Sequence, residues 1–364
     1  HRLPQCATIA LSFDYEYGKF SGGFYEQNFS ITGRTGLTGL LGSPVAHSLS
    51  PLMHNEAFRQ LGLDYVYLCF DVKEAKLETA VQGLKACGIR GFNLTMPDKN
   101  RMAEAGGRAF SRRVHHRAVN TVVNENGWLI GHNTDGTGFM RSVADAGLSI
   151  QGASMTIFGA GGASTAICAQ AALDGAKNLY IFARPSSRFH QRTLKLVDTI
   201  NRSTGCRAVL CDQADRAALK RALEESSLLV NATSVGMAPD TGRSILEDVS
   251  LLRPELTVAD IIYNPRRTLF PRQAKEAGCR TFNGMYMLLY QGAEAFRLWT
   301  GQEMPVEIIR EKYFRQNQTD SAGSVQGADL SACGGSEFFC GAAQSHKPDR
   351  SGDQSGRSVP SDKT

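Results

Sequence analysis

The stretch Met155-Thr156-Ile157-Phe158-Gly159-Ala160-Gly161-Gly162-Ala163-Ser164 decides the fold of this chain. An apolar, β-branched run ends in a cluster of glycines, and an alanine-rich segment extends from there to Leu173. This pattern predicts a buried strand, a sharp turn and a helix. Gly159 would permit the turn, Gly161 would let the backbone approach a pyrophosphate, and the helix N-terminus would offer free N–H groups.

A second predicted strand, residues 178–182, ends about twenty residues after the glycines, where a ribose-binding residue belongs. The order of strand, turn, helix and strand predicts a Rossmann-type dinucleotide-binding domain. The alternative is a helix cap that binds no ligand. After this strand comes Ala183-Arg184-Pro185-Ser186-Ser187-Arg188, which contains no acid to bond a ribose 2′-hydroxyl. Arg184 and Ser186 could instead bind a 2′-phosphate, which favours NADP over NAD; the alternative is an ordinary solvated arginine.

Composition excludes several classes of protein. The chain has 364 residues, of which 42% are hydrophobic and 21% charged, and its formal net charge is +5. The sequence has no basic stripe interleaved with aromatic residues, which argues against nucleic-acid binding. It also has no run of eighteen apolar residues, which argues against a membrane span. The nine cysteines are scattered without a C-x-x-C pair. This spacing is typical of reduced thiols, so we expect a cytoplasmic protein.

Changes in composition and periodicity along the chain predict five regions. We expect an irregular extension over residues 1–33, an α/β domain over 34–150, the Rossmann-type domain over 151–280, helices over 281–315 that pack back on the first domain, and a disordered tail over 316–364. In the first domain, strand-like runs (37–41, 65–70, 91–96) alternate with helical ones (51–61, 73–86). The fold class is therefore α/β, with a mostly parallel sheet in the first domain.

Three polar clusters follow predicted strands of the first domain, where open α/β sheets bind ligands. The first holds Ser48 and Ser50, one of which could be a helix N-cap. The second is Asn93-Leu94-Thr95-Met96-Pro97-Asp98-Lys99, and the third is the turn Asn133-Thr134-Asp135-Gly136. Any one cluster could be structural. Together they predict a site for a small, hydroxylated, anionic substrate.

These motifs resemble the shikimate dehydrogenase family. The similarity covers S-x-S-P-x-x-H-N (48–55), N-x-T-x-P-x-K (93–99), A-V-N-T (118–121), N-T-D-G (133–136), G-A-G-G-A (159–163), N-A-T-S-x-G-M (231–237), Y-N-P (263–265) and G-M-x-M-L-x-x-Q-G (284–292). The matches run in order from about residue 36 to 305. Residues 159–170 and 288–305 look most like the quinate/shikimate dehydrogenase branch.

The resemblance implies a role for each matching position. Lys99 and Asp135 would form the catalytic pair. Ser48, Ser50 and Tyr263 would bind the substrate carboxylate. The ring hydroxyls would be held by Asn93, Thr95, Asn120, Asp135 and Gln291. The cofactor would contact Gly159, Ala160, Gly161, Gly162, Ala163, Asn231, Thr233, Ser234 and Gly284, together with Arg184 and Ser186. Hydride would pass between the nicotinamide and C3 of shikimate or quinate, with no metal, in a monomer or homodimer.

One segment departs from the family. Residues 103–117 contain four arginines, two histidines and little helical periodicity, where relatives carry a small apolar helix. Two compensating frameshifts or genuine divergence would each explain it. If this segment prevents substrate from seating against Asn120, the chain would bind nucleotide without catalysing a reaction. A dehydrogenase of similar shape acting on a folate is a further alternative, which the serine pair argues against.

Overall fold

The computed structural model describes residues 30–95 and 119–314. Residues 30–35 form no helix or strand. The first sheet follows, with β1 (Gly36–Gly42), β2 (Tyr65–Asp71), β3 (Gly91–Leu94), β4 (Thr121–Glu125) and β5 (Trp128–His132) in the order β2-β1-β3-β4-β5. β1 pairs in parallel with β2 and β3, whereas β4 pairs antiparallel with β3 and β5. The sheet is therefore mixed, with its parallel part at β2, β1 and β3.

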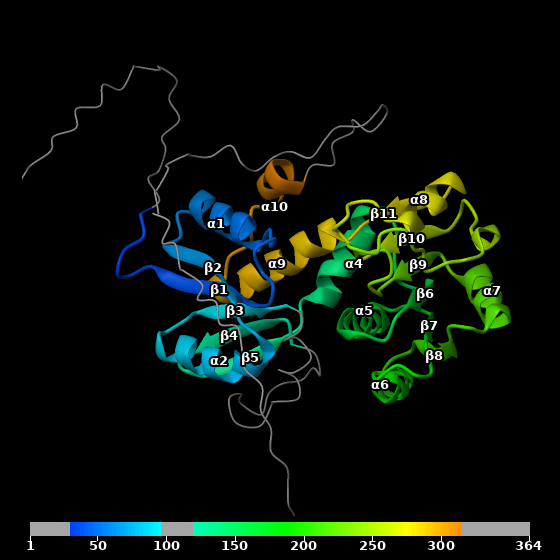
Figure 1. The fold of residues 1–364 in the computed structure, drawn as a ribbon, viewed down its shortest axis with the longest axis horizontal. Helices are drawn as coiled ribbons and strands as arrows, with labels where there is room; N and C mark the ends of the chain where they lie inside the picture. The colour runs from blue at the N-terminus through cyan, green and yellow to red at the C-terminus, as the bar shows by residue number, and fades with distance from the viewer. Residues whose placement is uncertain (1–29, 96–118, 315–364) are drawn as a thin grey trace, which may run out of the picture. The chain divides into compact units, whose positions relative to one another are not determined.

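Helices cover both faces of this sheet (Figure 1). Side chains of successive residues point to opposite faces, so Leu40 joins one hydrophobic cluster and Leu41 another. The first cluster includes residues of α1 (Ser50–Gln60), α9 (Met285–Thr300) and α10 (Val306–Ile309), and ends at Phe314 in a π-helical turn, Arg310–Phe314. The second includes residues of α2 (Leu77–Ala86), which follows a short 3-10 helix, Glu74–Lys76.

The second sheet contains six parallel strands in the described part of the chain. They are β6 (Ser154–Phe158), β7 (Asn178–Ala183), β8 (Arg207–Asp212), β9 (Leu228–Asn231), β10 (Thr257–Asp260) and β11 (Arg280–Phe282), in the order β11-β10-β9-β6-β7-β8. The direction of strand addition reverses at β6, so its neighbours are β7 on one side and β9 on the other. This is the order of a Rossmann fold, in which nucleotides bind at the reversal point.

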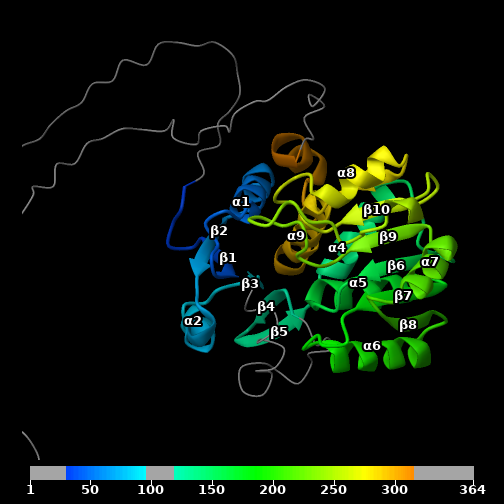
Figure 2. The ribbon, with the colours of Figure 1, turned by 45° about the vertical axis from the view of Figure 1, so that its right-hand side comes forward.

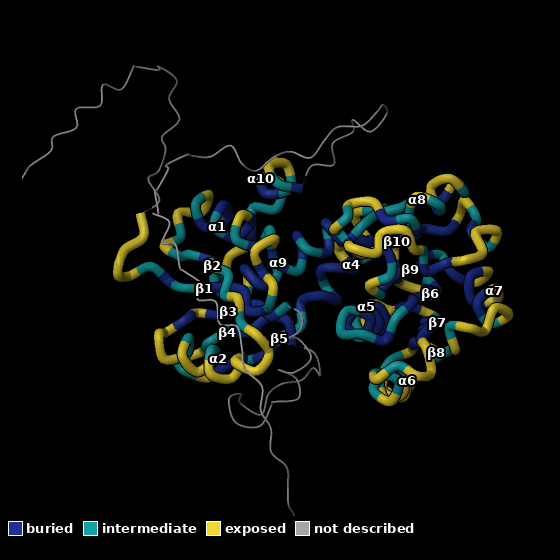
Figure 3. Tube along the Cα trace, in the orientation of Figure 1, coloured by how far each residue is buried: buried dark blue, intermediate teal, exposed yellow. Residues whose placement is uncertain are grey.

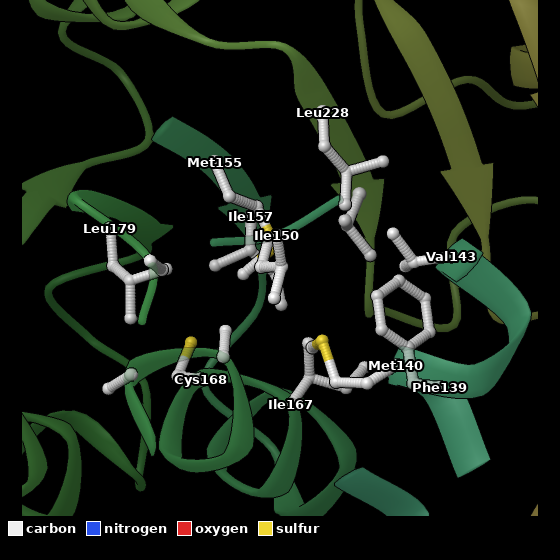
Figure 4. Packing of buried hydrophobic residues seen from close by; sticks show 14 of the residues in the cluster. Phe139, Met140, Val143, Ile150, Met155, Ile157, Ile167, Cys168, Leu179 and Leu228 are labelled. Atoms are coloured by element: carbon white, nitrogen blue, oxygen red, sulfur yellow. The ribbon is translucent and has the colours of Figure 1, made fainter. Parts of the chain in front are cut away.

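Five helices accompany the second sheet: α4 (Asp135–Asp145), α5 (Gly162–Leu173), α6 (His190–Ser203), α7 (Arg216–Glu225) and α8 (Leu269–Glu276) (Figure 2). A 3-10 turn, Val249–Leu251, lies between β9 and β10. Ile157 packs with α4, α5 and α6, whereas Phe158 packs with α7 and α8 on the opposite face. Figure 4 shows Phe139 and Met140 of α4 beside Ile167 of α5 in the first of these cores. The burial map shows the strands of this sheet as mostly buried (Figure 3).

The α/β fold class and the Rossmann-type sheet agree with the sequence analysis. The predicted strands and helices occur with boundaries shifted by a few residues. The hairpin of β4 and β5 was not predicted, although its turn, Asn126-Gly127, is a strong hairpin signal. Both turn residues adopt positive φ, 52° for Asn126 and 87° for Gly127. Within the described residues, no helix is both long and apolar enough to cross a membrane.

Candidate active site

The glycine loop follows β6 directly. Gly159 adopts φ 122°, and a Cβ there would lie 2.7 Å from the carbonyl oxygen of Ala232. A side chain is therefore excluded by both backbone conformation and space. Gly161 precedes the first residue of α5, Gly162, and a Cβ built on Gly161 would meet no atom within 4 Å. The helix N-terminus is thus approachable by a phosphate group, which its N–H groups and dipole favour.

Ala160 is buried, whereas Gly161, Gly162 and Ala163 are half-buried at the start of the helix. Ser164 closes the turn by donating from its hydroxyl to the Gly159 carbonyl oxygen at 2.8 Å. Arg184 and Ser186 follow the end of β7 and are exposed. The guanidinium of Arg192 donates to the Ala160 carbonyl oxygen at 3.4 Å. Arg192 lies in the first turn of α6, and no motif in the sequence marks it.

A second loop, residues 231–237, follows β9 on the other side of β6. Asn231 is buried, and its Oδ1 accepts from the Thr233 backbone N–H at 3.0 Å and from the Thr233 hydroxyl at 2.7 Å. The Asn231 amide donates to the Val235 carbonyl oxygen at 3.2 Å. Thr233 is half-buried and Ser234 exposed, so this loop presents hydroxyl groups beyond the carboxyl end of its strand.

A third loop, residues 260–268, follows β10 and carries Tyr263. Tyr263 is partly buried and packs against the hydrophobic cluster of the first sheet, as Leu49 also does. Burial raises the pKa of its phenol, so the hydroxyl stays neutral and can donate to an anion. Gly284, at the start of α9, closes on this loop: its N–H donates to the Ile262 carbonyl oxygen at 3.2 Å, and a Cβ on Gly284 would lie 1.9 Å from the Ile261 carbonyl oxygen.

Polar side chains of the first domain form a connected network. Asn93, on β3, is buried, and its amide donates to the Thr121 hydroxyl at 3.0 Å. The Tyr67 hydroxyl donates to Asn93 Oδ1 at 2.8 Å. Tyr67 is fully buried, and desolvation raises the pKa of its phenol. Thr95 lies just past β3 and is half-buried; its backbone N–H donates to the Leu41 carbonyl oxygen at 3.0 Å.

Asn120 connects three parts of the candidate site. Its amide donates to Asp135 Oδ1 at 2.9 Å, to the Thr134 hydroxyl at 2.9 Å and to Gln291 Oε1 at 3.3 Å. Asp135 is the first residue of α4 and 4% exposed, and Asn120 is 1% exposed. The Asp135 carboxylate therefore lies in a polar but largely water-excluded environment, where electrostatic interactions are strengthened.

Two glycines allow Asp135 and Gln291 to come together. A Cβ on Gly136 would lie 2.6 Å from the Ala166 carbonyl oxygen of α5. A Cβ on Gly138 would lie 2.5 Å from the Gln291 backbone nitrogen on α9. The N-terminal turn of α4 is thus held by close backbone contact with both neighbouring helices, which sets where the Asp135 side chain lies.

The serine pair occupies the loop before α1. Ser50 is buried and is the first residue of the helix, whereas Ser48 is half-buried. The interpretation of Ser50 as a side-chain N-cap is wrong: Leu49 takes the N-cap position, and no side chain caps the helix. Instead the Ser50 backbone N–H donates to the Ser48 hydroxyl oxygen at 3.2 Å. Pro51, which follows Ser50, has no N–H that would need a cap.

One buried acid was not singled out from the sequence. Asp260 ends β10, and its Oδ1 accepts from the Asn231 amide at 3.2 Å and from the Ile262 N–H at 3.0 Å. Its Oδ2 accepts from the Thr268 hydroxyl at 2.5 Å. The sequence did offer a signal for Asp260: this acid directly follows the apolar run Val258-Ala259 and lies three residues before the Y-N-P match.

Lys99 and residues 103–117 lie outside the described residues, as do residues 1–29 and 316–364.

Comparison with known proteins identifies the family. Residues 40–122 match the model of the shikimate dehydrogenase substrate binding domain, and residues 284–312 match that of the shikimate 5'-dehydrogenase C-terminal domain. The NADP(+) shikimate dehydrogenase of Listeria innocua is 49% identical over 284 residues, which cover 78% of this chain and 97% of that protein. The chain belongs to the shikimate dehydrogenase family.

Solved structures agree with this assignment. The shikimate 5-dehydrogenase of Listeria monocytogenes, crystallised with shikimate and NAD, is 49% identical with a TM-score of 0.70, covering 77% of this chain and 97% of that one. The quinate dehydrogenase of Corynebacterium glutamicum, crystallised with NAD, is 29% identical with a TM-score of 0.64, covering 77% and 98%. The family, the fold class, the oxidoreductase assignment and the nicotinamide cofactor predicted from the sequence are confirmed.

Proposed function

We propose that this member of the family catalyses the reversible oxidation of shikimate to 3-dehydroshikimate with NADP. The observation that supports this most directly is one polar network that joins Asn93 of β3, Asn120 just before β4, Asp135 of α4 and Gln291 of α9, in which all but the half-buried Gln291 are buried. Amide and carboxylate groups of this kind suit a substrate with several hydroxyls. The high identity to relatives named for this reaction supports the same substrate.

We assign the substrate carboxylate to Ser48, Ser50 and Tyr263. Two hydroxyls and a neutral phenol can donate to a carboxylate without adding charge of their own. We assign the ring hydroxyls to Asn93, Thr95, Asn120, Asp135 and Gln291. The free thiols of the six described cysteines accord with reaction in the cytoplasm, where thiols stay reduced.

The catalytic pair in this proposal is Lys99 with Asp135. NADP, held by the glycine loop and the 231–237 loop, would supply the acceptor for the hydride of substrate C3, and the proton of the C3 hydroxyl would pass to the Asp135 carboxylate of the pair. Lys99 donates a hydrogen bond to the C3 oxygen and stabilises the negative charge that develops there, while Asp135 orients the ammonium group. A neighbouring carboxylate favours the charged form of an ammonium group, which suits a charged donor better than a neutral base. Burial of Asp135 strengthens its attraction for the ammonium group, because little water competes for the charge of the carboxylate.

Cofactor binding is assigned to the glycine loop and the 231–237 loop. Gly159 to Ala163 would contact the pyrophosphate, and Asn231, Thr233, Ser234 and Gly284 the nicotinamide half. Arg184 and Ser186 are exposed at the end of β7, so both are accessible to an adenosine 2′-phosphate. The absence of an acid between residues 183 and 188 supports NADP over NAD.

Quinate is the second candidate substrate. The quinate dehydrogenase of Corynebacterium glutamicum also covers 77% of the chain, and the serine pair would suit either acid. The test is reduced-nicotinamide absorbance with shikimate or quinate against NADP or NAD. We expect the strongest turnover with shikimate and NADP. Folded protein that binds NADP but turns over in none of the four combinations would favour the nucleotide-binding alternative, in which residues 103–117 prevent substrate from seating.

The role of Lys99 can be tested by substitution. We expect Lys99→Ala to lower turnover by about three orders of magnitude or more, because the developing charge on the C3 oxygen would lose its donor. Steady-state kinetics at saturating substrate measures this. Lys177→Ala, which removes an exposed lysine between α5 and β7, is the matched control and should leave turnover unchanged. A loss of less than about tenfold, or roughly 1.4 kcal/mol of barrier, would contradict the assignment.

A further inference from the structure

Asp260 is a buried carboxylate that the assigned chemistry does not use. Its side chain ends β10 and is 1% exposed. Three donors point at it: the Asn231 amide, the Ile262 backbone N–H and the Thr268 hydroxyl. The ionised carboxylate accepts from all three donors at once, whereas the protonated form keeps three partners only if the Thr268 hydroxyl turns to accept from Oδ2–H. The charged form is therefore held without any rearrangement of these partners.

The three donors belong to two different loops. Asn231 begins the 231–237 loop and also folds it, through its bonds to Thr233 and Val235. Ile262 and Thr268 lie in the 260–268 loop, on either side of Tyr263. The loops are joined a second time by the Ile261 N–H, which donates to the Asn231 carbonyl oxygen at 3.1 Å. Asp260 thus links a loop assigned to the cofactor with the loop that carries a residue assigned to the substrate.

The positions of the preceding strands in the sheet indicate which half of the cofactor these two loops face. The glycine loop follows β6, and Arg184 follows β7, on one side of the reversal point. The 231–237 and 260–268 loops follow β9 and β10, on the other side. A dinucleotide bound across the reversal point places its two halves on opposite sides. The loops that Asp260 joins therefore face the nicotinamide half.

The charge on Asp260 has a stability cost. Burial raises the pKa of this carboxyl to about 6, and the hydrogen bonds from Thr268, Ile262 and Asn231 offset only part of that rise. All three groups are neutral, so no cation compensates the charge among these partners. A neutral residue would be less costly to bury at neutral pH. Stability alone therefore does not account for an acid at this position.

We propose that Asp260 is a positioning residue, whose carboxylate holds the 231–237 loop against the 260–268 loop and so aligns the nicotinamide half of the cofactor with the substrate. This inference rests on the proposed function for the identity of the two ligands. Asp260 would thus help to align the nicotinamide with the substrate without being one of the residues assigned to contact either ligand.

The test compares two ligands in Asp260→Asn and in the unmodified protein. NADP carries the nicotinamide, and 2′-phospho-ADP-ribose lacks it but keeps the adenosine half and the pyrophosphate. We expect the dissociation constant of NADP, from calorimetric titration, to rise at least fivefold in the variant, while that of 2′-phospho-ADP-ribose changes less than twofold. We also expect kcat with shikimate to fall at least tenfold.

Two further variants separate positioning from stability. Thr268→Val removes one donor and should shift NADP affinity in the same direction by a smaller factor, which keeps the test valid if Asp260→Asn does not fold. Thr156→Val removes a buried hydroxyl in the middle of β6, which bonds the Ser226 hydroxyl at 2.9 Å and contacts neither loop through that bond. We expect this control to lower the melting temperature without changing either dissociation constant.

The inference is overturned if NADP affinity is unchanged in Asp260→Asn and Thr268→Val, or if both ligands weaken by the same factor. Failure of the proposed function is a different result, because it would show as absent turnover in the unmodified protein. The binding comparison needs no turnover, so it decides the role of Asp260 in either case.

Discussion

At the scale of the residue, the site depends on buried polar groups whose partners come from distant parts of the chain. Asn120 is separated from Asp135 by fifteen residues and from Gln291 by 171. Each amide hydrogen and lone pair used in this network fixes the orientation of the next group. A single substitution here leaves several buried donors or acceptors unsatisfied, which costs about 1–3 kcal/mol per group.

His54 is a residue of the serine-pair motif that makes no such bonds. It is fully buried, its ring stacks on Tyr67 with centroids 4.4 Å apart, and Trp299 lies 5.2 Å away. Within the described structure neither ring nitrogen has a hydrogen-bond partner. Desolvation by burial lowers the pKa of His54 from 6.5 to about 3, so the folded protein keeps this imidazole neutral.

The sign of the resulting pH effect follows from linkage. The unfolded chain binds the proton more readily than the folded one, so the stabilising contribution is complete above pH 6.5 and is lost as pH falls toward 3. Each pH unit in this window changes the free energy of unfolding by about 1.4 kcal/mol. We expect His54→Phe to remove this dependence. Between pH 7.5 and pH 5 the unmodified protein should lose about 2 kcal/mol of unfolding free energy that the variant keeps.

Urea unfolding at both pH values measures this shift, and any constant cost of the larger ring cancels in the comparison. His47→Gln, at an exposed histidine in the loop before α1, is the control and should follow the unmodified protein. Equal pH dependence in His54→Phe and the unmodified protein would show that His54 is not kept neutral by the fold.

At the scale of the element, the packing of α4 against α9 and α5 brings Asp135 and Gln291 into reach of Asn120. We expect Gly138→Ala to force α9 away from α4, because its Cβ would lie 2.5 Å from the Gln291 nitrogen and 2.9 Å from the Gln291 Cα. Overpacking of this kind costs about 1–3 kcal/mol. Displacement of Gln291 should also raise the KM for shikimate several-fold.

The matched control for this prediction is Gly83→Ala in α2. That glycine is also helical, and a Cβ there would meet no atom within 4 Å. Alanine has the higher helix propensity, so Gly83→Ala should raise the unfolding free energy by about 0.5–1 kcal/mol and leave KM unchanged. Thermal unfolding and steady-state kinetics on both variants check the pair. An unchanged KM in Gly138→Ala would show that this helix contact does not set the position of Gln291.

At the scale of the whole molecule, an ion-pair network joins α1 to the segment after α10. Glu56 accepts from Arg59 at 2.5 Å and from Lys312 at 2.9 Å, across 256 residues of sequence. The Glu56 side chain is only 6% exposed, so this pairing is stronger than an ordinary surface contact. The hydrogen bond from Arg59, with further contributions from Gln60 and Lys312, lowers the pKa of Glu56 from 4.5 to about 2.

Because the folded protein holds the ionised form, this stabilisation is present above pH 4.5 and is lost as pH falls toward 2. We expect Glu56→Gln to lower the free energy of unfolding by about 1–3 kcal/mol at pH 7 and by progressively less below pH 4.5. Chemical denaturation at pH 7 and pH 3 measures the two differences. Glu247→Gln, which breaks an ion pair with Arg216 at a side chain 83% exposed, should change stability by less than about 0.5 kcal/mol. Equal losses in the two variants would contradict the prediction.

The sequence by itself determined the fold class and the dinucleotide-binding loop, because both depend on local patterns. The turn at Gly159 needs a residue without a Cβ, and the helix after it starts within a few residues. The order of the motifs sufficed for the family, since each motif is short and contiguous.

Only the tertiary structure decided which buried polar groups form hydrogen bonds with one another. Leu49, and not a serine side chain, occupies the N-cap of α1, because Pro51 removes one of the N–H groups that a cap would serve. Asp260 could not be connected to Asn231 from the sequence, since the strands that bear them become neighbours only in the sheet. Buried polar groups must find partners wherever the fold brings them, and contacts between residues far apart in sequence leave no local pattern.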